Sequence, residues 1–252
     1  MAVLLFTTIS ANAQQRKPGA AKARPAAATV NRPKLPIEYV KELNLGAATE
    51  YNQSSQYEDR RYSDYLIRQA GYHMPTIEEW AGVFPLNGAL SFEADDEVLD
   101  NYEAVTIAGE TFTFESDYQR NDRICYALRF KDEANKYLCA YRYKRMGRWV
   151  KNSYDSGVEV LVIYLGPSFK GSLQTIANEA YWTKNKAKAI RRYFPAPGFR
   201  SKDYPGMTDS MGTLAYYWTT EPNIVLEINV EGVHSGQLQG TFQSVSRPFI
   251  NK

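Results

Sequence analysis

The spacing of apolar residues predicts three helices in an otherwise strand-rich chain. Between positions 62 and 70 such residues recur at helical intervals and Gly71 follows as a stop, which predicts a helix over about residues 59–70. Its predicted core-facing side consists of Tyr62, Tyr65, Leu66 and Ala70. A second helix is predicted from Thr76 to Pro85, because T-I-E-E is a capping box in which Glu79 reaches back to the cap. The apolar side of this helix consists of Ile77, Trp80, Ala81 and Phe84, and that of a third helical run consists of Leu173, Ile176, Ala177 and Ala180.

The remaining pattern is typical of strands joined by turns. EAVTIAGETFTF (103–114) has a Gly-containing turn between two β-rich runs, and ICYALRF and YLCAYRY (124–143) flank the polar turn KDEANK, so both predict hairpins. The nearly all-apolar VEVLVIYL (158–165) predicts a central strand, whereas IVLEINVE (224–231) alternates apolar and polar residues. Strands outnumber helices, and the helices lie between runs of strands. These features predict an α+β domain with a mainly antiparallel sheet.

The N-terminus differs from the rest of the chain. Val3 to Ile9 is one short apolar run, far below the about 20 residues of a membrane-spanning helix, and Ala11-Asn12-Ala13 follows as a small-x-small cleavage pattern. We therefore expect residues 1–13 to be a signal peptide and the mature protein to be periplasmic, secreted or at the cell surface, without a transmembrane segment. Because no Pro/Gly/Ser-rich gap divides residues 36–252, we expect a single domain there.

Between these parts, residues 14–35 are rich in Pro and Ala, which predicts a basic, extended linker. Six of the chain's 30 basic residues lie in it, and it contains no acidic residue. The remainder therefore has 24 basic against 28 acidic residues, a charge of about −4. The sequence pI of 8.3 thus reflects the linker, and we expect no nucleic-acid partner.

The two cysteines lie in the predicted hairpin 124–143. Strand alternation places Ile124, Tyr126, Leu128 and Phe130 on one face. Cys125 is then on the other face, while Cys139 shares the face of the aromatic residues of its own strand. If the two apolar sets pack together, the sulfur atoms point to opposite sides of the sheet. Although export favours disulfides, this alternation predicts two free, mostly buried thiols.

Four segments occur in order along the chain: GYHMPTIEEW (71–80), YFPAPGFRS (193–201), GTLAYYWTTEP (212–222) and GTFQSVSRPF (240–249). They resemble the landmarks of the Fibrobacter major-paralogous-domain family, which is abundant in secreted and surface proteins of Bacteroidetes. This resemblance implies a C-type-lectin-like fold, similar to that of formylglycine-generating enzymes, with paired N- and C-terminal strands and long loops over the sheet. The closing SVSRPF departs from the family's G-x-S-V-R. The motif residues themselves, Trp80 among them, are expected to define the fold.

Candidate binding chemistry is concentrated in YRYKRMGRW (141–149), where cations alternate with aromatic rings. The predicted ligand contacts are Arg142, Tyr143, Arg148 and Trp149. Planar rings beside guanidinium groups suit anionic glycans, peptidoglycan fragments or a partner protein. The alternative interpretation, in which these rings belong to the core and the charges to solvent, stays open.

A calcium site is a second possibility, based on resemblance. Glu221-Pro222-Asn223 resembles the triplet that supplies Ca²⁺ ligands in sugar-binding C-type lectins, so Glu221 and Asn223 are the metal candidates. Calcium needs six to eight oxygen ligands, and the W-N-D sequence that completes such sites does not occur here. We therefore expect no cofactor, with calcium as the alternative.

Two classes of function follow. The first is a non-catalytic extracellular or cell-surface module for adhesion or binding, with a glycan or a surface protein as partner. The second is an enzyme on the same fold, either glycan-active or an oxidase. The sequence contains no nucleophile motif or phosphate-binding loop, and neither His73 nor His234 has metal-ligand spacing. An oxidase would need a cysteine pair positioned for copper. The binding module is therefore favoured.

Overall fold

The structure, a computed structural model, describes residues 32–251 except for 52–54, 87, 94–96, 122, 151–152, 202, 204–205 and 239–241. The predicted signal peptide and most of the predicted linker lie outside the described residues. The folded region begins ahead of the predicted boundary at Pro36. Leu35 is fully buried, and the Arg32 guanidinium lies 2.6 Å from the Glu38 carboxylate.

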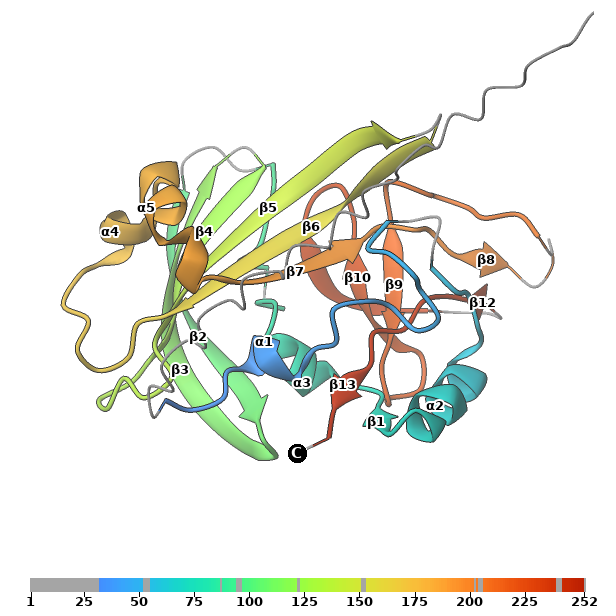
Figure 1. Cartoon of the computed structure of the whole chain (residues 1–252), viewed down its shortest axis with the longest axis horizontal. Helices are drawn as coiled ribbons and strands as arrows, with labels where there is room; N and C mark the ends of the chain where they lie inside the picture. The colour runs from blue at the N-terminus through green and yellow to red at the C-terminus, as the bar shows by residue number, and fades with distance from the viewer. Residues whose placement is uncertain are drawn as a thin grey trace, which may run out of the picture. The chain divides into compact units, whose positions relative to one another are not determined.

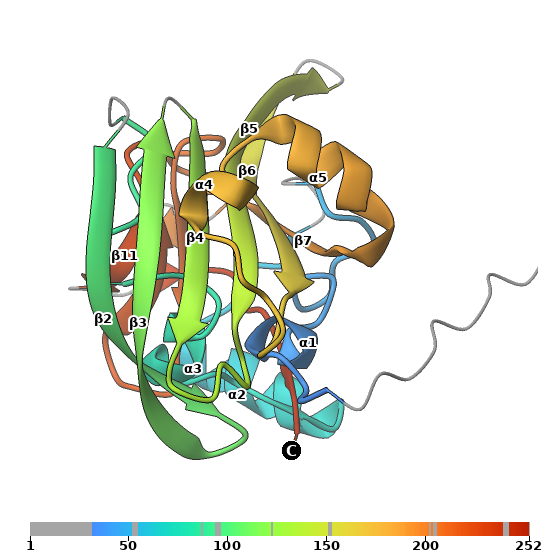
Figure 2. The same cartoon turned by 90° about the vertical axis from the view of Figure 1, so that its left-hand side faces the viewer.

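Six antiparallel strands form the larger sheet, which Figure 2 shows with its helix-covered side toward the viewer. In sheet order, which is also chain order, they are β2 (Glu97–Ile107), β3 (Glu110–Asn121), β4 (Ile124–Lys131), β5 (Cys139–Val150), β6 (Ser153–Tyr164) and β7 (Ile190–Pro195). Both predicted hairpins are confirmed, as β2–β3 and β4–β5. The predicted central strand is β6, which pairs with β5 on one side and β7 on the other.

A smaller sheet and two strand pairs complete the β-structure (Figure 1). The three-stranded sheet consists of β9 (Ala215–Trp218), β10 (Ile224–Ile228) and β11 (Val233–Gln237), with β10 in the centre. The pairs are β1 (Tyr72–His73) with β13 (Phe249–Ile250) and β8 (Arg200–Ser201) with β12 (Phe242–Gln243). All of these named strands pair in antiparallel fashion, which confirms the predicted α+β class with a mainly antiparallel sheet.

In the described residues, five α-helices accompany these sheets: α1 (Pro36–Tyr39), α2 (Arg60–Gln69), α3 (Ile77–Ala81), α4 (Leu173–Ile176) and α5 (Glu179–Asn185), and a short 3₁₀ helix (Lys186–Lys188) follows α5. The capping box of Thr76 and Glu79 is confirmed, although α3 ends before Phe84. The predicted third helix is divided in two, because the Asn178 side chain accepts from the Tyr181 amide and starts α5 anew. In the described part of the chain no helix is long and apolar enough to cross a membrane.

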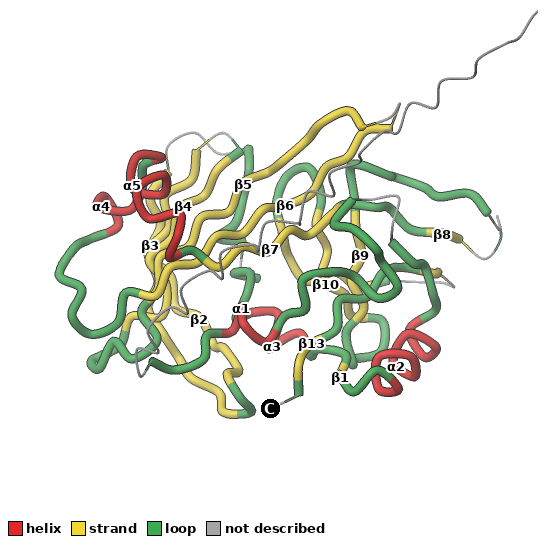
Figure 3. The backbone as a smooth tube through the Cα atoms, viewed as in Figure 1, coloured by secondary structure: helices red, strands yellow, loops and turns green. Residues whose placement is uncertain are grey.

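The elements stack in layers with a separate apolar cluster between each pair. The main cluster lies between the larger sheet and the smaller one, with α1 and α3 at its edge. A second cluster lies on the outer face of the larger sheet, under α4 and α5 (Figures 1 and 2). A third lies under α2, against β9 and β10. Long connections without regular structure join the layers, among them residues 41–51 after α1 (Figure 3).

The four sequence motifs meet at Trp80 in the main cluster. The ring centroid of Trp80 lies 5.8 Å from that of Phe194, 5.7 Å from that of Tyr217 and 5.0 Å from that of Phe249. Each of these rings comes from a different motif, and all four are buried. The motifs therefore form the core junction between the N-terminal helices, β7, β9 and the C-terminal strand.

The predicted apolar face of the helix at 59–70 is wrong. Ser63 and Ile67 are the buried residues of α2, whereas Tyr62 and Tyr65 are 47% and 55% exposed. Ile67 packs in the third cluster and so fixes the rotation of the helix. The tyrosines, which the spacing pattern placed in the core, point to solvent instead.

The predicted faces of the β4–β5 hairpin are also partly wrong. Cys125 lies opposite Tyr143, and Cys139 opposite Arg129, so both sulfur atoms lie on the face toward the main cluster. A bulge opposite Ser116, where Phe130 has a φ of 67°, turns Phe130 onto that same face. The thiols are free and buried, as expected. They stay apart because four residues, roughly 13 Å of strand, separate their positions, not because they face opposite ways.

Candidate functional site

The structure separates the first two predicted ligand contacts. Arg142 and Tyr143 are neighbours on β5 and point to opposite faces of the sheet. Arg142 is 8% exposed, and its guanidinium lies 3.3 Å from the carboxylate of Glu179 and 3.7 Å from that of Glu159. Tyr143 is fully buried; its hydroxyl donates to the Val83 carbonyl and accepts from Arg129. This burial is incompatible with Tyr143 touching a surface ligand.

The other two predicted contacts lie further along the same strand. Arg148 is paired with Asp155 of β6, and Trp149 with Tyr154. The side chains of this part of the hairpin lie outside the described residues. Six residues of strand, roughly 20 Å, separate Arg148 from Arg142. The four predicted contacts are therefore not gathered into one site, and binding by Arg148 and Trp149 stays a prediction.

The calcium candidates lie in the turn between β9 and β10. The Glu221 carboxylate accepts a hydrogen bond of 3.3 Å from the Ile77 amide at the first turn of α3, and the side chain is half-buried. Asn223 is exposed and has a φ of 63°. Among the described residues, no group of three or more His, Cys, Asp or Glu side chains is placed to hold a metal ion.

The two thiols lack the properties that an oxidase would need. Both are fully buried in the main cluster. Burial raises the pKa of Cys125 to about 12 and raises the pKa of Cys139 well above its usual range. Protonated, solvent-excluded thiols whose register positions on the paired strands β4 and β5 are four residues apart are not a copper-binding pair.

The strongest surface feature is a pair of tyrosines on α2. The ring centroids of Tyr62 and Tyr65 lie 6.1 Å apart, and their planes differ by 16°. Arg61 beside them is exposed, and Arg68 forms an ion pair with Asp64 on the next turn. Because the opposite side of α2 is anchored through Ile67, these rings are held on a rigid element. We call Tyr62 and Tyr65 the tyrosine platform.

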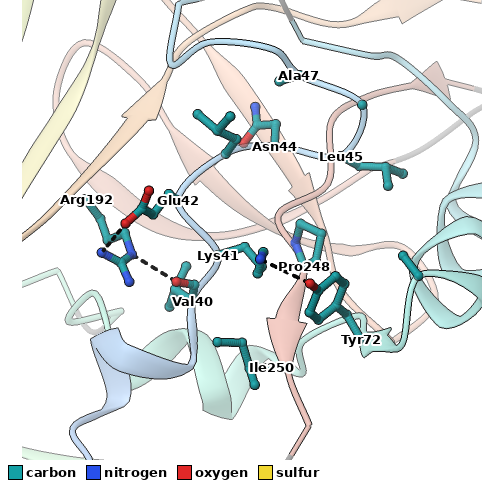
Figure 4. A pocket seen from close by; sticks show the side chains of 13 residues that line it. Val40, Lys41, Glu42, Asn44, Leu45, Ala47, Tyr72, Arg192, Pro248 and Ile250 are labelled. Atoms are coloured by element: carbon teal, nitrogen blue, oxygen red, sulfur yellow. Dashed lines mark hydrogen bonds and ion pairs between the residues drawn. The ribbon is translucent and has the colours of Figure 1, made fainter. Parts of the chain in front are cut away.

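A pocket of about 540 Å³ opens next to this helix (Figure 4). It is lined by the segment 40–47, the end of α2 at Ala70, Tyr72 of β1, Arg192 of β7 and the region of β13. Tyr62 lies eight residues before Ala70, which is about 12 Å along the helix axis. The tyrosine platform thus begins near the start of α2, whereas this opening, which we call the Lys41–Tyr72 pocket, lies at the end of the helix.

Two hydrogen-bond donors lie together in the Lys41–Tyr72 pocket. The Lys41 ammonium donates to the Tyr72 hydroxyl over 3.1 Å and lies 4.7 Å from the centre of its ring. Figure 4 shows this pair on one side of the 40–42 segment and Arg192 on the other. Arg192 donates to the Val40 carbonyl at 2.9 Å and lies 3.9 Å from the Glu42 carboxylate.

A buried cation lies behind the pocket wall. Arg247 is fully buried and donates to the backbone carbonyls of Lys41, Glu42 and Tyr193. In the described region, no carboxylate forms an ion pair with it. Burial lowers the pKa of the Arg247 guanidinium, and the charge of Arg192 acts in the same direction. The guanidinium of Arg247 therefore binds the backbone of Lys41 and Glu42, which forms the pocket wall.

Neither the tyrosine platform nor the pocket is evident from the sequence alone. The spacing of the two tyrosines fits the buried face of a helix, although a tyrosine tolerates exposure better than the nearby Ile67. The pocket residues are scattered from position 40 to position 250, and they form no motif. The one available signal was Arg247 within SVSRPF, a charged residue inside a fold-defining segment.

Comparison with known proteins gives one family. No curated protein and no solved structure matches the chain. The family described as "Domain of unknown function (DUF8237)" matches residues 32–249, which coincides with the folded region from Arg32 onward. The chain belongs to this family.

Proposed function

We propose that this protein is a non-catalytic binding module that contacts a glycan, exported to the periplasm, the cell surface or the medium. The observation that carries the proposal is the tyrosine platform. Two exposed rings with nearly parallel planes, fixed on a helix, offer apolar faces on which sugar rings can stack at little cost in side-chain entropy. The pocket at the end of the same helix offers polar contacts for the hydroxyl groups of a ligand long enough to reach both.

We also propose that the DUF8237 family is related to the Fibrobacter major-paralogous-domain family and has a C-type-lectin-like scaffold. The pairing of β1 with β13 supports this relationship, because that fold joins strands near both ends of the domain. The meeting of the four motifs around Trp80 supports it further. In such a scaffold, rigid elements hold variable loops, and binding is a property of the loops and exposed elements.

The test is a glycan array probed with three forms of the protein. The wild type is expected to bind a defined set of glycans, and Tyr62→Ala/Tyr65→Ala is expected to lose at least about tenfold in affinity. Tyr102→Ala is the matched control, since Tyr102 is 69% exposed on the edge strand β2 and should not affect binding. Circular dichroism should give the same spectrum for all three.

Two outcomes would contradict the proposal. One is a wild type that binds no glycan on the array, which would leave a protein partner as the predicted ligand. The other is a double variant that binds as tightly as the wild type.

A further inference from the structure

We infer that the Lys41–Tyr72 pocket is a carboxylate subsite, so that the glycan bound by this protein contains an acidic sugar. This inference rests on the proposed function and names the class of its ligand. It is carried by the geometry of two adjacent donors and by the charge around them.

The donors match the shape of a carboxylate. Lys41 donates one hydrogen to the Tyr72 oxygen and keeps two others, and the Tyr72 hydroxyl keeps its own hydrogen. In the described residues, no acceptor is found for that hydroxyl hydrogen. The two donor atoms are 3.1 Å apart, so each can bind one oxygen of the same carboxylate group.

The surrounding charges favour a negatively charged group. Lys41 and Arg192 line the pocket with Glu42 as the acidic residue beside them, and the buried Arg247 adds a positive charge behind the wall. The Glu42 carboxylate lies 3.9 Å from Arg192, but its side chain is 83% exposed. Because solvent screens an exposed ion pair, Glu42 compensates these cations weakly.

The aromatic residues on the helix that ends at the pocket are the reason to expect the acid on a sugar. An oligosaccharide whose acidic residue occupies the pocket would extend about 12 Å along α2, from Ala70 to Tyr62, to stack on the tyrosine platform. A ligand of a few sugar units can thus use the donor pair and the tyrosine platform together. An acidic peptide would satisfy the donors, but it would not need parallel aromatic rings.

The experiment compares matched carboxylated and neutral oligosaccharides. The probes are oligogalacturonate against its methyl ester, β-1,4-linked oligomannuronate against β-1,4-mannan oligomers, and sialyllactose against lactose, with a sulfated lactose as a further arm. Affinities are measured by titration calorimetry at two salt concentrations. At least one carboxylated probe is expected to bind about tenfold more tightly than its neutral partner, and this preference should shrink at high salt.

Three variants test whether the preference for carboxylated probes arises in the Lys41–Tyr72 pocket. Lys41→Gln and Tyr72→Phe are each expected to reduce the preference for the carboxylated probe about tenfold. Tyr72→Phe retains the ring and removes only the hydroxyl, so it is the variant least prone to unfolding. Glu42→Gln, the matched control, should bind the carboxylated probe at least as tightly as the wild type, because it removes a nearby negative charge.

The outcomes separate this inference from the proposed function. If neutral and carboxylated partners bind equally, if sulfated lactose is preferred over every carboxylated probe, or if the preference survives both Lys41→Gln and Tyr72→Phe, the carboxylate subsite is overturned while glycan binding stands. If no probe of either kind binds and the array is also blank, both are overturned.

Discussion

Arg129 places a guanidinium in the middle of the aromatic core, and the polar groups around it are arranged to satisfy it. Its Nε and Nη2 donate to the Glu103 carboxylate at 2.9 and 2.5 Å, and Nη1 donates to the Tyr143 hydroxyl at 2.7 Å. Carbonyl oxygens of Ala81 and Val83 accept the remaining hydrogens. A buried charge is tolerated only with such a complete set of partners.

This network explains why the aromatic residues of β5 could not be placed from the sequence. YRYKR alternates rings and cations, a pattern that suits a surface patch as well as a core strand. The choice depends on Glu103 and Val83, which come from elements 40 to 60 positions away. Local pattern therefore predicts the strand, whereas the burial of Tyr143 follows from tertiary contacts.

The buried thiols make stability depend on pH in the alkaline range. In the folded state burial raises the pKa of Cys125 to about 12 and raises that of Cys139 as well, whereas an unfolded thiol ionises near pH 9. Above that pH the unfolded chain loses protons that the native state keeps, so stability falls as the pH rises. We expect each thiol to lower the free energy of unfolding by about 1 kcal/mol between pH 9 and 10, because the unfolded thiol is half ionised at pH 9 and mostly ionised at pH 10.

Urea unfolding of the wild type and of Cys125→Ala at these pH values measures this dependence. The free energy of unfolding of Cys125→Ala should fall less steeply with pH than that of the wild type, because the variant has one buried thiol fewer. A native protein that reacts rapidly with a thiol reagent at pH 8, or a variant with an unchanged slope, would show that Cys125 is not buried as described.

At the scale of the element, α2 shows how a helix can be predicted correctly while its rotation is not. Asp59 caps the helix and Gly71 follows its end, and both signals are local. The rotation depends on which stripe meets the third cluster, and Tyr62 with Leu66 competes with Ser63 and Ile67 for that place. In the structure Ile67 takes this place and packs with Trp218 of β9 and Val225 of β10 in the third cluster.

Single substitutions on α2 test this rotation. Ile67→Ala is expected to lower the free energy of unfolding by about 2–5 kcal/mol, since it leaves a cavity in the third cluster. Tyr65→Ala removes an exposed ring and should change stability by less than about 0.5 kcal/mol. Urea unfolding of both variants decides the matter. A Tyr65→Ala variant that is destabilised as strongly as Ile67→Ala would restore the orientation predicted from spacing.

At the scale of the whole molecule, the order of the strands could be predicted in part. The hairpins and the central strand β6 follow from local patterns, because each strand pairs with its chain neighbour in the larger sheet. The β1–β13 pair joins segments nearly 180 residues apart, and only the motif resemblance suggested it. The candidate site lies beside this pair, which is why no local pattern indicated the Lys41–Tyr72 pocket.

The C-terminal strand closes the molecule. Phe249 pairs with His73 across β1–β13, and its ring packs edge-on against Trp80 with the centroids 5.0 Å apart. Just before it, Arg247 binds the carbonyls of the 41–42 segment. The last residues therefore hold the N-terminal segment, α3 and β7 in place at once, and the pocket wall with them.

Replacing Phe249 tests whether this closure sustains both the fold and the site. Phe249→Ala is expected to lower the free energy of unfolding by about 3–5 kcal/mol, because it opens a cavity beside Trp80. Phe249→Leu keeps most of the apolar volume and should cost less than about 1.5 kcal/mol. Urea unfolding measures the stability of both variants. Folded Phe249→Ala should also bind the carboxylated probe more weakly than the wild type, since the neighbouring residues Pro248 and Ile250 line the pocket. If Phe249→Ala is as stable as the wild type, the C-terminal strand is an appendage and not the closing element of the core.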